Sequence, residues 1–156
     1  MVVDLCLKIL SGLSPQGSLS RYIAGRIRFM SPAKPADVVS AFLDAFSARD
    51  FERVRNYLSD ESFSYQSPID TFSDADTFIA SMSRVGPILE RIERTRTFVD
   101  GNVVCSVLMV HTTMDMLKGV IVVHVATVVD GRITVLESVF DATEYNKMIV
   151  PPDEAI

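Results

Sequence analysis

The side chains that could carry out acid–base chemistry are few and widely spaced. Arg91 and Glu93 stand two residues apart in a segment rich in β-branched residues, so both side chains lie on the same face of a predicted strand. At the rim of a pocket this pair would supply an acid and a clamp for an anion. A solvated surface pair at the end of a strand is the alternative interpretation.

His111 and His124 are the only histidines in the chain. Cross-strand pairing through tight turns places Glu90 opposite His111, His111 opposite His124, and His124 opposite Glu137, on the face away from the predicted pocket. This row fits a polar seam, a pH-sensitive contact between two copies, or a transition-metal site. A flat row across several strands does not converge on one point, so we expect no metal site. We likewise expect no cofactor.

Other features limit the classes of function. No nucleophile motif, glycine-rich phosphate loop or metal-spaced cluster is present, and Cys6 and Cys105 are too few and too far apart for a disulfide framework. The net charge of −5 argues against a nucleic-acid partner. The longest apolar stretch is much shorter than the roughly 20 residues needed to span a bilayer. We therefore expect a soluble, cytoplasmic protein with no membrane contact.

The first 29 residues differ in charge from the rest of the chain, with four basic residues against one acidic residue. Ser31 to Pro35 is typical of a linker. The chain is therefore expected to comprise a basic N-terminal extension and linker (1–33), one globular domain (34–149) and a C-terminal tail (150–156). The extension could result from a start codon upstream of a true initiator at Met30, act as a targeting peptide, or form a helix added to the domain.

The domain begins with helices and ends with strands. Helical periodicity predicts helices over 36–49, 50–58 and 73–85, with Asp50 and Ser73 at helix starts and a short edge strand over 62–66. Four long strands are predicted over 88–99, 102–113, 119–129 and 132–140, with Asp-Gly turns joining the first pair and the last pair. Helices followed by an antiparallel meander indicate an α+β fold.

Several strings in this order resemble the SnoaL-like, nuclear-transport-factor-2-like superfamily, which includes ketosteroid isomerases and limonene epoxide hydrolases. The strings are 41–46, 48–51, 58–61, 129–133 and 139–141. The resemblance implies a cone-shaped domain with three N-terminal helices on a curved, mainly antiparallel sheet, a cystatin-like α+β barrel. It also implies a pocket on the concave face and a homodimer through the convex sheet face.

The superfamily's catalytic groups are missing at the matching positions. The isomerase tyrosine corresponds to Phe42, its base to Gln66 or Ser67, and its second acid to Val123 or Val125. The three polar residues of the epoxide hydrolases correspond to Leu108, Val110 and Ser138. No activity is transferred, and whether the chain is an enzyme stays open.

The predicted register gathers an apolar lining with few polar points, which is typical of a small-molecule site. The expected ligand-binding residues are Phe42, Phe46, Tyr65, Gln66, Leu108, Val110, Val123, Val125, Ser138 and Phe140, with Ile121, Leu136 and the Arg91/Glu93 pair on the same face. A core filled by these side chains is the alternative. The opposite face is expected to carry Cys105, Val107, Met109, Val122, Ala126, Val135 and Val139, and to be covered by a second copy or by the N-terminal extension.

Three functions follow from these expectations. The first is a SnoaL-like domain that binds a small hydrophobic molecule. The second is an isomerase, cyclase or hydratase acting on a steroid-, polyketide- or terpenoid-like substrate, with Glu93 or the Tyr65/Gln66 pair in place of the missing groups. The third is an adaptor module without a cavity.

Overall fold

A computed structural model describes residues 33–115 and 118–149 of the chain. The chain divides into two units between Ser31 and Pro32. The predicted extension up to residue 32 and the predicted tail (150–156) lie outside the described residues. The rest of this section concerns the second unit.

The three predicted N-terminal helices are present as α2 (Pro35–Ser47), α3 (Phe51–Arg55) and α4 (Ala75–Val85), and a 3₁₀ turn, η1 (Gly86–Ile88), follows α4. A proline in its first turn suits the start of α2. Asp50 begins α3 as predicted, since its carboxylate accepts a hydrogen bond of 3.0 Å from the Arg53 N–H. Asp74, and not the predicted Ser73, begins α4.

Six strands form one sheet in the order β2-β1-β6-β5-β4-β3. Its long strands are β3 (Leu89–Asp100), β4 (Val103–Thr112), β5 (Val120–Val129) and β6 (Arg132–Val139). The short strand β1 (Ser64–Gln66) pairs in parallel with β6, and β2 (Thr71–Phe72) extends the edge. The fold is therefore α+β, as predicted. A fourth helix, α5 (Thr143–Ile149), was not predicted from the sequence.

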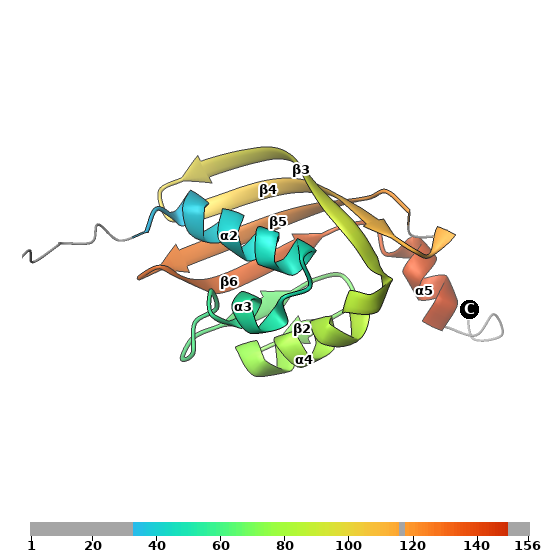
Figure 1. Cartoon of the computed structure of the whole chain (residues 1–156), viewed down its shortest axis with the longest axis horizontal. Coiled ribbons are helices and arrows are strands. Elements are labelled where there is room, and N and C mark those ends of the chain that lie inside the picture. The colour runs from blue at the N-terminus through green and yellow to red at the C-terminus, as the bar shows by residue number, and fades with distance from the viewer. Residues whose placement is uncertain (1–32, 116–117, 150–156) are drawn as a thin grey trace, which may run out of the picture. The chain divides into compact units, whose positions relative to one another are not determined.

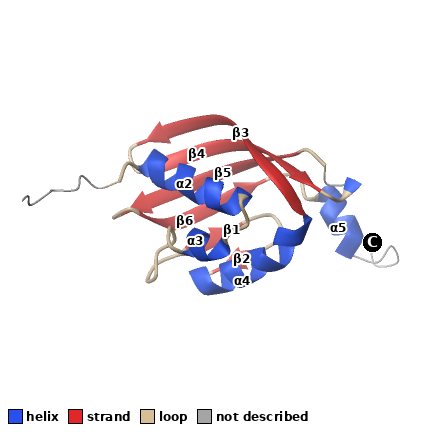
Figure 2. Ribbon diagram, in the orientation of Figure 1, coloured by secondary structure: helices blue, strands red, loops and turns tan. Residues whose placement is uncertain are grey.

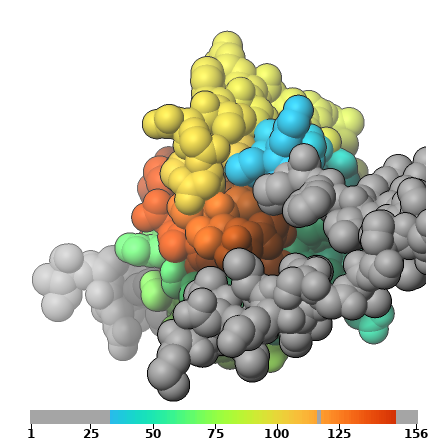
Figure 3. Space-filling model, turned by 90° about the vertical axis from the view of Figure 1, so that its left-hand side faces the viewer, coloured from blue at the N-terminus to red at the C-terminus, as the bar shows by residue number. Residues whose placement is uncertain are grey.

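Helices α2, α3 and α4 lie against one face of the curved sheet (Figures 1 and 2), and among the described residues no helix covers its other face. Figure 3 views the end of the sheet that carries the two hairpin turns, with β3 and β4 in yellow above β5 and β6 in orange. We call the helix-covered face concave and the other face convex. The core lies between the helices and the concave face, where the largest fully buried side chains include Phe42, Phe78, Leu58, Leu108, Ile133 and Leu136.

The predicted register of β5 is wrong. The expected pairing of His111 with His124 implies Val110 opposite Val125, but Val110 pairs with Val120, and Leu108 pairs with Val122. The offset is an odd number of residues, which exchanges the two faces of a strand. On the other side of β5, an irregularity between Thr127 and Val128 exchanges the faces again. Val122 and Ala126 therefore point to the concave side, and Ile121, Val123 and Val125 point to the convex side.

The first half of β3 is also exchanged relative to the prediction. The strand pairs with β4 as an ordinary hairpin from Asp100 back to Arg96, and a bulge then leaves Thr95 unpaired. Beyond the bulge, Ile92 lies opposite Val110, so Arg91 and Glu93 point to the convex side. Their predicted place on the pocket face is wrong for this reason.

Candidate functional site

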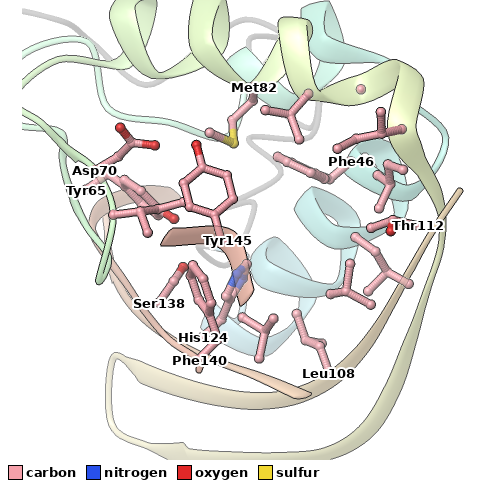
Figure 4. Close-up of a pocket in the computed structure, with 18 of the residues that line it drawn as sticks. Phe46, Tyr65, Asp70, Met82, Leu108, Thr112, His124, Ser138, Phe140 and Tyr145 are labelled. Atoms are coloured by element: carbon pink, nitrogen blue, oxygen red, sulfur yellow. The ribbon is translucent and has the colours of Figure 1, made fainter. Parts of the chain in front are cut away.

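A cavity of about 220 Å³ lies between the helices and the concave face of the sheet (Figure 4). The lining is mainly apolar and comes from β3 to β6, α2, α4, α5 and the β1–β2 connection. Its members are Phe46, Tyr65, Ile69, Asp70, Phe78, Met82, Val85, Gly86, Ile88, Leu89, Ile92, Leu108, Val110, Thr112, Val122, His124, Ser138, Phe140 and Tyr145. The space between helices and sheet is therefore not completely filled by side chains.

Six of the ten predicted ligand-binding residues line this cavity: Phe46, Tyr65, Leu108, Val110, Ser138 and Phe140. Phe42 lies in the core, where it is 0% exposed and does not reach the cavity. Gln66 is exposed at the end of β1. Val123 and Val125 lie on the convex face because of the register of β5. Whether the six lining residues bind a ligand stays a prediction.

The weak catalytic candidate, Glu93, belongs to an exposed cluster on the convex face. Its carboxylate lies 2.6 Å from an Arg91 guanidinium nitrogen and 3.4 Å from His111 Nε2. Arg91, and not Glu90, is the residue opposite His111. The interpretation of Arg91 and Glu93 as a solvated surface pair therefore agrees with their placement, and their pocket interpretation does not.

The predicted row of two histidines and two glutamates does not exist. His111 pairs across to Arg91 on the convex face, while His124 pairs with Ser106 on one side and Ser138 on the other. The two histidines are on opposite faces of the sheet. The row was the only basis for three interpretations, namely a polar seam, a pH-sensitive contact and a metal site. None of the three is supported without it.

In place of that row, three polar side chains cross the concave face. Ser106, His124 and Ser138 sit opposite one another on β4, β5 and β6. Their Ser106 Oγ, His124 Nδ1 and Ser138 Oγ atoms are buried, and no described residue forms a hydrogen bond with any of them. A buried polar atom without a partner costs about 1–3 kcal/mol, so such atoms are uncommon in a folded core.

His124 and Ser138 face the cavity, whereas Ser106 lies beyond it, under α2. Burial lowers the pKa of His124 to about 4, since the charged imidazolium would lose its solvation there. His124 is partly exposed and lines the cavity. At neutral pH, His124 is therefore an uncharged donor and acceptor of hydrogen bonds.

Asp70 and Tyr145 add polar groups to the lining, on the side of the cavity that α5 and the β1–β2 connection form (Figure 4). Asp70 is the only charged residue of the lining. A turn fixes its backbone, since the Asp70 N–H donates to Ser67 Oγ at 3.0 Å and the Ser67 N–H donates to the Asp70 carbonyl at 2.9 Å. The Asp70 carboxylate has no hydrogen bond or ion pair among the described residues.

Sequence reasoning missed His124, Asp70 and Tyr145 for different reasons. His124 lies on a strand that is apolar on both faces, so alternation could not assign it to one of them. Asp70 lies two residues after Pro68, whereas the resemblance places the isomerase base before this proline, at Gln66 or Ser67. Tyr145 lies on α5, for which the capping residue Asp141 was an available signal.

Within residues 33–115 and 118–149, no three His, Cys, Asp or Glu side chains come close enough together to hold a metal ion. None of the helices in this part of the chain is both long enough and apolar enough to cross a membrane.

Comparison with known proteins places this geometry in a family. Residues 39–136 match the SnoaL-like domain. The structure resembles an NTF2-like protein of unknown function from Cytophaga hutchinsonii, with a TM-score of 0.65 and 18% identity over 76% of this chain and 99% of that one. An LEH-like epoxide hydrolase from M. tuberculosis gives a TM-score of 0.63 and 24% identity, over 73% and 87% of the two chains.

A candidate ketosteroid isomerase from Kribbella flavida gives a TM-score of 0.61 and 14% identity, over 69% and 78% of the two chains. At these identities the resemblances establish the fold alone. A search of the curated proteins gives no match. The fold is thus that of the NTF2-like proteins. Within that class, the chain belongs to the SnoaL-like family.

Proposed function

We propose that this protein binds a small hydrophobic molecule in the cavity between its helices and the concave face of its sheet. The observation that carries the proposal is a mainly apolar cavity of about 220 Å³ beside the hydrophobic core. A dry apolar cavity of roughly 150 Å³ suffices to bind benzene. The space here therefore suits a molecule with one or two rings.

The test compares a variant that fills the cavity with one that adds the same bulk elsewhere. Val110→Phe places a larger side chain in the lining, whereas Val135→Phe adds it to the convex face. Naphthalene binding, followed by its fluorescence, is expected to be lost in Val110→Phe and kept in Val135→Phe. Absence of binding to the unmodified protein by naphthalene and by its uncharged derivatives would reject the proposal.

A second candidate function is the isomerase, cyclase or hydratase activity, now with a different acid. Glu93 is on the convex face, but Asp70 supplies a carboxylate to the cavity lining. In such a reaction the Asp70 carboxylate would take a proton from the carbon next to a substrate carbonyl, and the electron pair would move onto the carbonyl oxygen. Return of the proton to the same or another carbon completes the exchange.

Proton exchange detects this step without knowledge of the natural substrate. A small cyclic ketone incubated with the protein in D₂O is expected to acquire deuterium beside its carbonyl, as measured by mass spectrometry. Asp70→Asn should abolish the exchange, and the matched change Glu93→Gln should leave it unaltered. Exchange that persists in Asp70→Asn would exclude this role for Asp70.

We also propose that a second copy of the chain covers the convex face. That face carries a patch of apolar side chains from four adjacent strands, of which Phe98, Ile121 and Val139 are 58%, 58% and 60% exposed. Cys105, Val107, Met109, Val123, Val125 and Val135 share this face. Glu137 lies among these residues, opposite Val125. Monomers rarely leave large apolar patches in water, and a broad sheet face packs well on another sheet.

A charge added to this apolar patch tests the dimer. Val139→Glu is expected to give a monomer in sedimentation velocity experiments, because an unpaired carboxylate would be buried at the interface. Thr71→Glu, on the exposed edge strand β2, provides a control that should leave the dimer intact. A monomeric unmodified chain would contradict the proposal.

A further inference from the structure

The polar groups of the cavity indicate which kind of hydrophobic molecule it accepts. Two of them, His124 and Ser138, lie side by side on β5 and β6 (Figure 4), apart from Asp70 and Tyr145. Both belong to the lining, and His124 Nδ1 and Ser138 Oγ have no hydrogen-bonding partner among the described residues. In most proteins such atoms are satisfied by a neighbouring side chain, by ordered water or by a ligand.

The helices and sheet hold these two side chains in place. Ser138 is 4% exposed, and the neighbouring strand positions are occupied by the buried residues Leu136 and Ala126. His124 is flanked along its own strand by Val122 and Ala126 on the same face. Both side chains line the cavity, so water or a ligand inside it is the partner available to their unpaired atoms.

The chemistry of the two groups defines the partner. A neutral imidazole has one donor and one acceptor nitrogen, and a serine hydroxyl can donate and accept. Together they can satisfy a hydroxyl, which both donates and accepts, or a carbonyl oxygen, which accepts twice. They offer no positive charge at neutral pH, because burial lowers the pKa of His124 to about 4.

Charge elsewhere in the lining excludes an anionic group. The lining contains no lysine or arginine, and its one charged member is the carboxylate-bearing Asp70. A ligand carboxylate would lose its hydration without gaining a cationic partner. Most of the remaining lining residues are apolar, which favours a ligand with an apolar body.

We infer that the natural ligand is an uncharged alcohol, phenol or ketone of one or two rings, bound with its single polar oxygen against His124 and Ser138. This inference rests on the proposed binding function, and it adds the chemical class of the ligand and its orientation. The polar oxygen lies at the sheet, and the apolar body extends toward α4 and Tyr145.

Three matched probes test the inference: naphthalene, 2-naphthol and 2-naphthoate. They share one ring system and differ only in having no polar group, a hydroxyl or a carboxylate. The protein is expected to bind 2-naphthol roughly tenfold more tightly than naphthalene, the effect of one or two buried hydrogen bonds. It should bind 2-naphthoate more weakly than either neutral probe. Calorimetric titration at pH 7.5 measures all three affinities.

Variants connect the preference to the two residues. His124→Leu and Ser138→Ala are each expected to reduce the preference for 2-naphthol over naphthalene to threefold or less, as an estimate from the loss of one hydrogen bond. His111→Leu, the matched change on the convex face, should leave it unaltered. Ser138→Ala removes a single oxygen, so it keeps the test valid if His124→Leu does not fold.

The possible outcomes separate this inference from the proposed function. Equal binding of naphthalene and 2-naphthol would overturn the inference and leave the proposed function standing. A preference that both variants retain, or tight binding of 2-naphthoate, would also overturn it. Failure of all three probes to bind would reject the proposed function together with the inference.

Discussion

Two phenylalanines one helical turn apart on α2 have different surroundings. The ring centroids of Phe42 and Phe46 lie 5.9 Å apart, but Phe42 is fully buried in the core and Phe46 lines the cavity. A hydroxyl added to Phe42 would be buried without a partner, so Phe42→Tyr is expected to cost about 1–3 kcal/mol of stability. Phe46→Tyr should cost less, because its hydroxyl can point into the cavity. Urea denaturation of both variants measures the difference, and equal losses would contradict the assignment of Phe46 to an open cavity.

The stability of the protein at acidic pH should depend on His124. Burial lowers the pKa of His124 to about 4 in the folded state, while the unfolded chain titrates near its ordinary value of 6.5. The unfolded state therefore binds more protons between these two values. The contribution of uncharged His124 to the free energy of unfolding is complete above about pH 6.5. It is lost as the pH falls toward 4, with a maximum loss of roughly 3 kcal/mol.

His124→Gln removes the titrating group from this position and should flatten that part of the profile. The comparison is the free energy of unfolding at pH 7 and at pH 4.5, for the unmodified protein, His124→Gln and the convex-face control His111→Gln. Between pH 7 and pH 4.5, the free energy of unfolding of the unmodified protein and of the control is expected to fall by about 2–3 kcal/mol more than that of His124→Gln. Identical losses in all three proteins would show that His124 is not desolvated.

At the scale of elements, the junction between α4 and β3 depends on close contact with α3. A methyl group added at Gly86 would lie 2.8 Å from Phe51 Cε2 and 3.0 Å from its Cζ. Gly86→Ala is therefore expected to cost about 1–3 kcal/mol through overpacking. Phe51→Leu should remove part of this clash. A double-mutant cycle measured by chemical denaturation is expected to show favourable coupling, and strictly additive losses would contradict the contact.

The start of α5 controls the position of Tyr145. The Asp141 carboxylate accepts hydrogen bonds from the Thr143 N–H at 2.9 Å and from the Thr143 hydroxyl at 2.6 Å, and both lower the pKa of Asp141. Asp141→Ala should loosen the helix and increase amide hydrogen exchange over 143–149, with β6 unchanged. Glu144→Gln, which removes only an exposed ion pair to Lys147, serves as the control and should have a smaller effect.

The elements show which parts of the fold could be predicted from sequence. The turn at Asp130-Gly131 has φ angles of 50° and 76°, as a tight primed turn requires, and it pairs Val129 with Arg132 as predicted. The bulges at Thr95 and beside Val128 have no comparable signal, since ordinary β-forming residues occupy them. Each bulge exchanges the faces of the strand beyond it.

The candidate site was predicted only in part for the same reason. Strand β6 extends directly from a well-defined turn, and β4 lies next to another, so Leu108, Val110 and Ser138 were assigned to the correct face. Strand β5 follows a longer connection from Thr113 to Gly119 and is apolar on both faces, so neither turn length nor alternation fixed its register. His124, the main polar group of the cavity, was lost through this ambiguity.

At the scale of the whole molecule, the two faces of the sheet have separate roles in the proposed function. The concave face and its helices enclose the cavity, and the convex face offers its apolar patch to a second copy. The Arg91, Glu93 and His111 cluster lies on the convex face, away from the cavity. Changes that break the dimer should therefore leave ligand binding largely intact.

The N-terminal segment is the competing cover for the convex face, and a shortened chain distinguishes the two. A chain that begins at Met30 keeps every residue from α2 onward, including all the core residues of the domain. If a second copy covers the patch, the shortened chain is expected to unfold with the same free energy as the full chain and to sediment as the same dimer.

If residues 1–29 covered the patch instead, their removal would expose Ile121, Val139 and their neighbours, and a monomeric full chain would become a self-associating short one. Sedimentation of both chains over a range of concentrations measures this directly. Val139→Glu in the shortened chain is the matched control, because it should abolish any association that uses the convex face. Association of the shortened chain that survives Val139→Glu would place the contact on another surface and contradict the proposed dimer.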